Sequence, residues 1–282
     1  MAAGEASGKT GVTGADTGLV TIRKCEALEE MQACFALQKE VWKFADADLI
    51  PVRMFVVAAK IGGQVIGAFV QRNDKKNDET ELIGFAVAIP GMRNRHCYLH
   101  SQMLAVRQQY RNAGLGRRMK LSQREDALAR GFELMEWTFD PLEIKNAYLN
   151  IEKLGAIARR YNVNQYGIAS SPLQGGLPTD RLVAEWWMKS KRVEAVLADT
   201  PRAEFECRAR IDVPAEIYEW KAEATTRKQA LAVQDRNREQ FRRAFAAGLS
   251  ALGYERDEHG NGRFLLGEWA EALQYSARAA SP

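Results

Sequence analysis

The sequence predicts a mixed α/β (α+β) fold, with a central sheet flanked by helices, and two observations support it. Apolar runs of strand length recur between residues 55 and 106, with turn residues between them. The run at 98–106 is then followed by a glycine-containing turn, a helix-like segment and a further apolar run at 132–139. A helical crossover places these last two strands parallel, whereas the earlier strands are close enough in sequence to pair antiparallel. Together they indicate a mixed sheet.

The N-terminal elements follow from hydrophobic spacing and turn residues. Residues 25–44 have apolar side chains at helical spacing, which predicts an amphipathic helix. Two apolar runs, 55–60 and 65–72, are joined by Ile61-Gly62-Gly63-Gln64, and a glycine pair in that place predicts a β-hairpin. After a polar turn at 73–80, we expect a third strand at 81–89, closed by Pro90-Gly91, and a fourth at 98–106.

The same criteria give the later elements. Up to residue 190 we expect a helix at 117–130, a strand at 132–139, a helix at 147–161 and a strand at 181–188. After it we expect a strand at 208–213, one long helix at 222–252 capped by Gly253, and a short strand at 263–266.

These elements suggest three segments. Residues 1–18, rich in Gly, Ala and Thr, are expected to form a flexible leader. The main domain would span 19–190, and an αβ extension packed on it would span 191–282, ending in a frayed tail at 274–282. The composition of residues after 190 differs from that of the main domain, and no chemical motif is found there.

Composition excludes several classes of protein. The 282 residues carry 40 Lys and Arg against 36 Asp and Glu, a net charge of +4, which is too small to indicate nucleic-acid binding. No apolar run approaches the 18 residues of a membrane span, and the N-terminus lacks the pattern of a signal peptide. The four cysteines lack metal-binding spacing, so we expect no metal and mostly buried, reduced thiols in a cytoplasmic protein.

The most informative motif is a turn between the strand at 98–106 and the helix that follows. It has an Arg-x-x-Gly-x-Gly pattern and reads Arg111-Asn112-Ala113-Gly114-Leu115-Gly116. Glycines let backbone N–H groups turn toward a ligand, and a helix N-terminus adds unpaired donors and a positive dipole end. The motif therefore predicts a phosphate site. It matches neither the dinucleotide fingerprint, whose glycine spacing differs, nor a Walker loop, since Gly-Lys occurs only at Gly8-Lys9.

Basic side chains gather around this turn, which favours a polyanionic ligand, although a solvated helix face explains them too. They are Arg107, Arg111, Arg117, Arg118, Lys120 and Arg124.

The segment 103–119 resembles the central strand, loop and helix of the GNAT family of N-acyltransferases, and the resemblance extends over about residues 20–190. It is nearest to a branch marked by Thr-Phe-Asp-Pro-Leu, Lys-Leu-Gly-Ala and Pro-Thr-Asp-Arg-Leu, found here at 138–142, 153–156 and 178–182. The resemblance implies that acetyl-CoA or another acyl-CoA is the co-substrate, and that the fourth and fifth strands splay apart around its pantetheine arm.

The resemblance also assigns binding residues. Leu104, Ala105 and Val106 would line or pair with the pantetheine arm, and Asn146 would contact it. The pyrophosphate would be bound by the loop and the start of its helix, comprising Arg111, Asn112, Ala113, Gly114, Leu115, Gly116 and Arg117. For Arg111 both phosphate contact and bracing of the loop remain open.

Catalytic candidates follow from the need to deprotonate the attacking amine. His100, on the fourth strand, has an ordinary pKa suited to this task, but a structural, hydrogen-bonded role is an alternative. Asp140, at the end of the fifth strand, is a second candidate base, with an Asx turn as its alternative. Ile151 occupies the position where the family usually has an acidic Tyr, so Tyr148 is a candidate acid for the departing thiolate.

Arg181 precedes an apolar strand, where its guanidinium could bind a carboxylate of the substrate. The alternative is an internal ion pair with Asp180. The sequence thus predicts an acyl-CoA-dependent N-acyltransferase that acts on a primary amine of a small molecule, with an amino acid as acceptor and succinyl as acyl group both suggested by the branch. A catalytically degenerate module that binds acyl-CoA for regulation is the alternative. No nucleic-acid or membrane partner is expected, and a homodimer is left open.

Overall fold

The computed structural model describes residues 20–71, 80–93, 95–168, 171, 174–269 and 271. The expected leader at 1–18, the turn at 73–79 and the tail at 274–282 lie outside these residues. The helices are α1 (Leu28–Trp42), α2 (Val52–Lys60), α3 (Leu115–Ala129), α4 (Ile144–Tyr148), α5 (Lys191–Leu197), α6 (Ile217–Ala222) and α7 (Arg227–Ala246), with 3-10 turns at Asp46–Asp48 and Gln108–Tyr110 and a π-helical turn, η3, at Leu149–Lys153.

The strands form one ten-stranded sheet in the order β1-β2-β3-β4-β5-β7-β6-β9-β10-β8. They are β1 (Val20–Lys24), β2 (Gln64–Gln71), β3 (Thr80–Arg93), β4 (His96–Val106), β5 (Leu134–Phe139), β6 (Ile157–Asn162), β7 (Arg181–Trp187), β8 (Ala209–Val213), β9 (Leu249–Arg256) and β10 (Gly262–Glu268). The pair β4–β5 is parallel and the other pairs are antiparallel, as expected for a mixed sheet.

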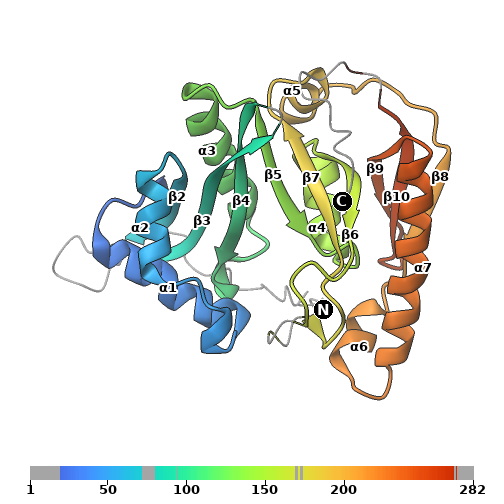
Figure 1. Ribbon diagram of the computed structural model, residues 1–282, viewed down its shortest axis with the longest axis horizontal. Helices are drawn as coiled ribbons and strands as arrows, with labels where there is room; N and C mark the ends of the chain where they lie inside the picture. The colour runs from blue at the N-terminus through green and yellow to red at the C-terminus, as the bar shows by residue number, and fades with distance from the viewer. Residues whose placement is uncertain are drawn as a thin grey trace, which may run out of the picture.

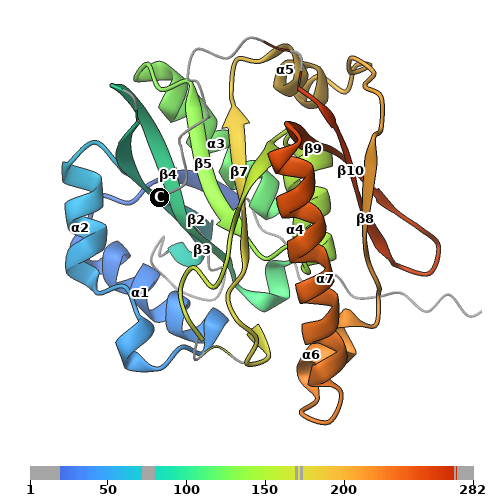
Figure 2. The ribbon, with the colours of Figure 1, turned by 45° about the vertical axis from the view of Figure 1, so that its right-hand side comes forward.

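Helices cover both faces of the N-terminal half of the sheet (Figure 1). Side chains of alternate residues on β2, β3 and β4 enter two different clusters, because successive residues of a strand point to opposite faces. Phe85, Val87 and Ala105 pack with α1 and α2, whereas Ala86 and Leu104 pack with α3. In the other half, α6 and α7 lie beside the C-terminal strands (Figure 2).

Contacts tie residues after 190 to the preceding strands. Arg192 is buried and donates to the carbonyls of Gly155 and Ile151. Arg238 of α7 pairs with Asp180 at 2.7 Å, and Phe241 stacks on Tyr161 of β6. The strand β9 joins the sheet through β6.

The predicted hairpin at 55–72 is wrong, because its first arm is the helix α2. The apolar run at 55–60 suggested a strand, but Phe55 and Ala58 are the residues that become buried, at helical spacing. Pro51 precedes the helix, and Gly62, at φ +89°, lies just after its end.

The strand β3 continues through Pro90-Gly91, which was expected to end it. Beyond Ala88 it has lost β2 as a neighbour and pairs with β4 alone, so the missing N–H of Pro90 breaks no ladder on that side.

Two predicted helices are too long. The helix at 147–161 ends at Lys153, since Gly155 adopts φ +76°, and 157–161 belong to β6. The helix predicted at 222–252 is present only as α7, because 222 is the last residue of α6, Gly248 (φ +82°) follows the end of α7, and 249–252 belong to β9. Gly253, expected as the cap, lies inside β9 instead.

The cysteines only partly follow the prediction. Cys25 and Cys34 are buried and Cys207 is half-buried, but Cys97 is exposed at the start of β4. No group of His, Cys, Asp and Glu among the described residues could hold a metal ion.

Candidate active site

The central feature of the site is a short ladder between β4 and β5. Although both strands are longer, they pair only at Leu99 with Met135 and at His100 with Glu136. Beyond this last rung they diverge (Figure 1). The part of β4 from Gln102 to Val106 therefore has β3 on one side and no strand on the side toward β5.

A β-bulge accompanies this divergence. In the β3–β4 ladder, Val87 pairs with Met103 and Ala88 pairs with Ser101, so Gln102 is the additional residue. A bulge bends its strand and changes the direction of the side chains that follow. The bulge lies directly after the last rung with β5, so it bends β4 where the two strands separate.

The predicted phosphate loop lies at the end of β4. Gly114 (φ +75°) is the N-cap of α3, and a Cβ added to it would meet no atom within 4 Å. No side chain caps α3, and its first turn holds no acidic residue. By contrast, Ser190 caps α5, and Glu30 accepts from backbone N–H groups at the start of α1. The N-terminus of α3 therefore keeps an open approach and unpaired N–H donors.

Basic side chains around the loop differ in what they bind. Arg107 forms ion pairs with Glu81 and Glu40, and Arg124 donates to the carbonyl of Met188. Arg111 donates to the carbonyl of Val106 at 2.9 Å, which supports its bracing role.

Arg117 and Arg118 also donate to backbone carbonyls. Arg117 reaches Lys153 in η3, and Arg118 reaches Val20. Since these acceptors are neutral, the guanidinium charges of the two residues and of Arg111 are not balanced by a carboxylate at these bonds.

One predicted base, His100, lies at the last rung of the β4–β5 ladder on the sheet face opposite α3. It is half-buried, and burial lowers the pKa of its imidazole. Glu136 acts against this shift, whereas the positive charges of Lys120, Arg160 and Arg93 add to it. The imidazole is therefore mainly neutral at pH 7, as a proton acceptor must be.

A group of paired charges surrounds Glu136 on this face. Glu136 and Glu185 are directly opposite on β5 and β7, and both are buried. Arg93 binds Glu136 with two hydrogen bonds of 2.6 and 2.7 Å. Arg159 and Arg160 come from a bulge in β6, where both oppose Val183, and both reach Glu185. Arg160 also binds Glu136 and so bridges the two carboxylates.

Arg181 lies on the same face, at the start of β7 and four residues before Glu185. The predicted alternative, a pair with Asp180, is wrong, because the Asp180 carboxylate is bound by Arg238, Tyr161 and the Asn164 N–H. The Arg181 guanidinium instead donates to the backbone carbonyl of Asp180 at 3.2 Å and to Gln174 Oε1 at 3.0 Å, and it lies 5.8 Å from the ring centre of Tyr166. Tyr166 shares a 3.1 Å hydrogen bond with Thr138 on β5.

Two other predicted catalytic residues are not brought to His100. Asp140 accepts from the Leu142 N–H, forming the Asx turn that was the alternative, and from Lys221 Nζ at 2.9 Å. Tyr148 lies between Lys153 and Arg256 of β9, toward the C-terminal end of the sheet order. Asn146 is exposed on α4. Asn150, one turn later, is buried, and its Nδ2 has no hydrogen-bond acceptor among the described residues.

Sequence reasoning missed Lys120 as a distinct residue. It lies one turn after Gly116 on α3, and its ammonium is buried against Ser101 and Trp137. Its helical spacing with Gln123 and Ala127, which are also buried, was the available signal.

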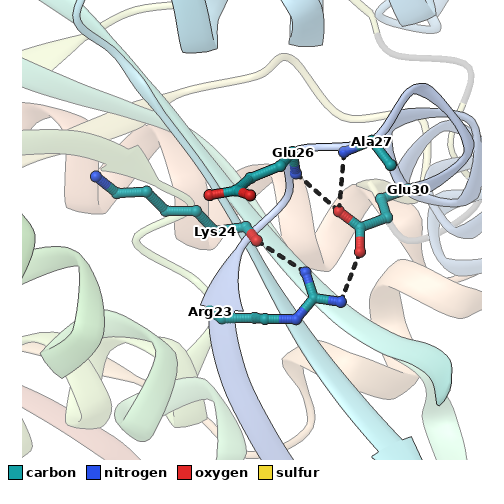
Figure 3. A pocket seen from close by; sticks show the side chains of 5 residues that line it. All are labelled: Arg23, Lys24, Glu26, Ala27 and Glu30. Carbon is teal, nitrogen blue, oxygen red and sulfur yellow. Dashed lines mark hydrogen bonds and ion pairs between the residues drawn. The ribbon is translucent and has the colours of Figure 1, made fainter. Parts of the chain in front are cut away.

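A surface hollow at the β1–α1 junction is not part of this site. Arg23, Lys24, Glu26, Ala27 and Glu30 line it (Figure 3). The Glu30 carboxylate accepts from Arg23 and from the N–H groups of Glu26 and Ala27. These bonds form a helix cap and leave that carboxylate occupied.

Comparison with known proteins identifies the fold. No family model and no curated protein sequence matches the chain. Among solved structures, NAA60 of Arabidopsis thaliana in complex with acetyl-CoA is 12% identical, covers 61% of this chain and 100% of its own, and superposes with a TM-score of 0.50. A GNAT acetyltransferase from Streptococcus pneumoniae is 17% identical, with 59% and 98% covered and a TM-score of 0.45.

The Escherichia coli ribosomal-protein-S18-alanine N-acetyltransferase is 16% identical, with 61% and 97% covered and a TM-score of 0.45. Identities this low are informative about the fold alone. No helix among the described residues is long and apolar enough to cross a membrane. The chain has the GNAT acetyltransferase fold, as its loop motif predicted.

Proposed function

We propose that this protein transfers an acyl group from acyl-CoA to a primary amine of a small molecule, by direct attack of the amine in a ternary complex. The divergence of β4 from β5 directly after the His100–Glu136 rung is the observation that supports this most strongly. It leaves one edge of β4 without a strand partner, next to a helix N-terminus without a cap. An extended amide-containing arm that ends in a pyrophosphate matches both features.

Three further features fit acyl-CoA. The open space at Gly114 admits a phosphate to the α3 N–H donors, and Arg111, Arg117 and Arg118 bring positive charge to that end. The Nδ2 of Asn150 is a buried donor that has no acceptor in the described part of the chain. It belongs to η3, which Arg117 joins to the start of α3 through the Lys153 carbonyl. Acyl-CoA would supply the activated thioester.

The face of the sheet opposite α3 is the proposed acceptor side. His100 would take the proton from the attacking amine, since burial keeps its imidazole neutral. Asp140 does not take this role, because its carboxylate oxygens accept hydrogen bonds from Lys221 Nζ and the Leu142 N–H. Arg181, whose guanidinium contacts the Asp180 backbone carbonyl but not the Asp180 carboxylate, would bind a carboxylate of the acceptor, as an amino acid would offer.

A small acceptor is favoured by a contact across this face. The segment between β6 and β7 reaches α1, where Ser171 Oγ donates to the carbonyl of Trp42 at 2.7 Å. Such a contact restricts the room for an extended peptide.

The proposal is tested by measuring thiol release from acetyl-CoA and from succinyl-CoA with a set of amino acids, simple amines and short peptides. Amine-dependent release with a small amine is expected, and the better donor identifies the acyl group. Binding of CoA without turnover would indicate the degenerate regulatory module instead. Turnover with peptides only would reject the small-molecule acceptor.

A further inference from the structure

Lys120 is a buried cation without a counter-charge among the described residues. Only 5% of this residue is exposed, and its ammonium forms no ion pair with any residue that the structure describes. It donates to Ser101 Oγ at 2.8 Å and lies 3.8 Å from the ring centre of Trp137. A lone buried ammonium costs stability, and no carboxylate among the described residues offsets that cost.

The position of Lys120 is specific. Ser101 follows His100 immediately on β4, and Trp137 follows Glu136 on β5, so both adjoin the last rung between the strands. Because successive strand residues alternate, Ser101 and Trp137 face α3 whereas His100 faces the acceptor side. The ammonium is therefore held at the point where the strands separate, on the side from which the α3 loop would deliver the donor.

The proposed transfer needs an acid at this point. When the tetrahedral intermediate collapses, the C–S bond breaks and its electron pair leaves on sulfur as a thiolate. The amine proton has already gone to His100 on the other face. A second group must give the sulfur a proton, or the thiolate remains free to attack the new amide.

We propose that Ser101 is the catalytic acid for the departing CoA thiolate and that Lys120 supplies its proton. The Ser101 hydroxyl gives its proton to the sulfur while Lys120 Nζ passes one to Ser101 Oγ, so that a thiol, an unchanged serine and a neutral lysine result. Lys120 regains its proton from solvent before the next cycle. This assignment rests on the proposed function.

Two observations support it. Burial lowers the pKa of Lys120 to about 7, so the ammonium can release its proton near neutral pH, and no charged group opposes this shift. Ser101 Oγ also donates to Gln123 Oε1 at 3.2 Å, and the two bonds hold the hydroxyl between lysine and glutamine. Rotation about one bond turns its proton away from Gln123.

The first test needs no turnover. The pKa of the thiol of bound CoA is followed by the ultraviolet absorbance of the thiolate during a pH titration. Because a thiolate next to Ser101 favours the protonated form of Lys120, the two groups titrate as a coupled pair. We therefore expect the wild-type protein to lower the thiol pKa relative to free CoA, and Lys120→Met to raise it by about one unit or more over the wild type. Lys189→Met, which removes an exposed lysine paired with Glu133, should leave it unchanged.

The second test is kinetic. Lys120→Met and Ser101→Ala should each lower kcat by about 100-fold, and the double variant should lose no more than either single one, because the two act as a unit. The fall of kcat at alkaline pH should disappear in Lys120→Met. Lys120→Arg should not restore the rate, since arginine keeps its proton at neutral pH.

The outcomes separate the two proposals. An unshifted thiol pKa with intact CoA binding, or full activity in Lys120→Arg, would overturn the proton role and leave the acyltransferase proposal standing. If the wild-type protein binds no CoA, the proposed function fails and the role of Lys120 fails with it.

Discussion

The two faces of the sheet differ most at neighbouring residues of β4. His100 points to the face where Glu136 and Glu185 are balanced by Arg93, Arg159 and Arg160. Ser101 points to the other face, where no described carboxylate pairs with Lys120. Burial is the largest cause of a lowered pKa for both His100 and Lys120.

The same physical cause has opposite chemical consequences. Lowering the pKa of an imidazole keeps it neutral at pH 7 and able to accept a proton, whereas lowering that of an ammonium brings it into the range where it donates one. If the amine and the thioester meet where β4 and β5 diverge, the sheet can thus hold a base on one face and an acid on the other. Variants at each face test this division.

Replacing His100 should have the largest effect on catalysis. His100→Gln is expected to lower kcat/KM by about 10²–10⁴-fold, because no other neutral base lies at the last rung. In the wild type, kcat/KM should fall on acidification below the ordinary histidine pKa, since protonated His100 cannot accept a proton, and this limb should vanish in the variant.

His259→Gln is the matched control for this measurement, as His259 is exposed beside Glu258 near the β9–β10 turn. A His100→Gln enzyme with an unchanged acid limb would show that another group is the base.

Arg181 should have a smaller effect, limited to acceptor binding. Arg181→Met is expected to raise the KM for a carboxylate-bearing amine by about tenfold, the worth of one charge-assisted hydrogen bond, and to leave kcat nearly unchanged. The same amine without its carboxylate should show equal KM values for both proteins. Equal KM values for the carboxylate-bearing amine would remove Arg181 from the acceptor site.

Besides its effect on kcat, Lys120→Met should change stability, and this smaller change should be a gain. Lys120→Met is expected to raise the free energy of unfolding at pH 7 by about 2 kcal/mol, because it removes a lone buried charge. In the wild type, the folded-state pKa near 7 lies below the unfolded value, so stability should rise as the pH increases from about 7 toward 10. Denaturant unfolding at several pH values measures both effects. A loss of stability in Lys120→Met would indicate a structural role instead.

Local signals predicted the regions nearest the loop well. Gly114 and the helix after it, the crossover and the parallel β4–β5 pair follow from short-range spacing and from the handedness of the chain. The α2 error shows the limit of such signals, since β-branched residues form a helix there when Phe55 and Ala58 are buried against neighbouring elements.

The partners and orientations of the candidate site residues were harder to predict, because they depend on tertiary contacts. Nothing near Asp140 in the sequence indicated that Lys221, 81 residues away, would bind its carboxylate. Likewise, Arg238 of α7 binds the Asp180 carboxylate, so Arg181 forms no ion pair with it and contacts only the Asp180 backbone carbonyl. His100 could be placed on β4, but the sequence did not fix which face it takes, because one step in register reverses that face.

The most direct test of the account is a calorimetric titration of CoA into the wild-type protein and two glycine variants. Gly114→Leu and Gly131→Leu place the same side chain at similar positive φ values, +75° and +84°, at opposite ends of α3, and neither Cβ meets another atom within 4 Å. Their backbone strain should therefore be similar. We expect CoA to bind the wild type and Gly131→Leu equally, and Gly114→Leu at least about tenfold more weakly. Equal affinities in all three proteins, or no binding by the wild type, would contradict the assignment of this loop as the phosphate site.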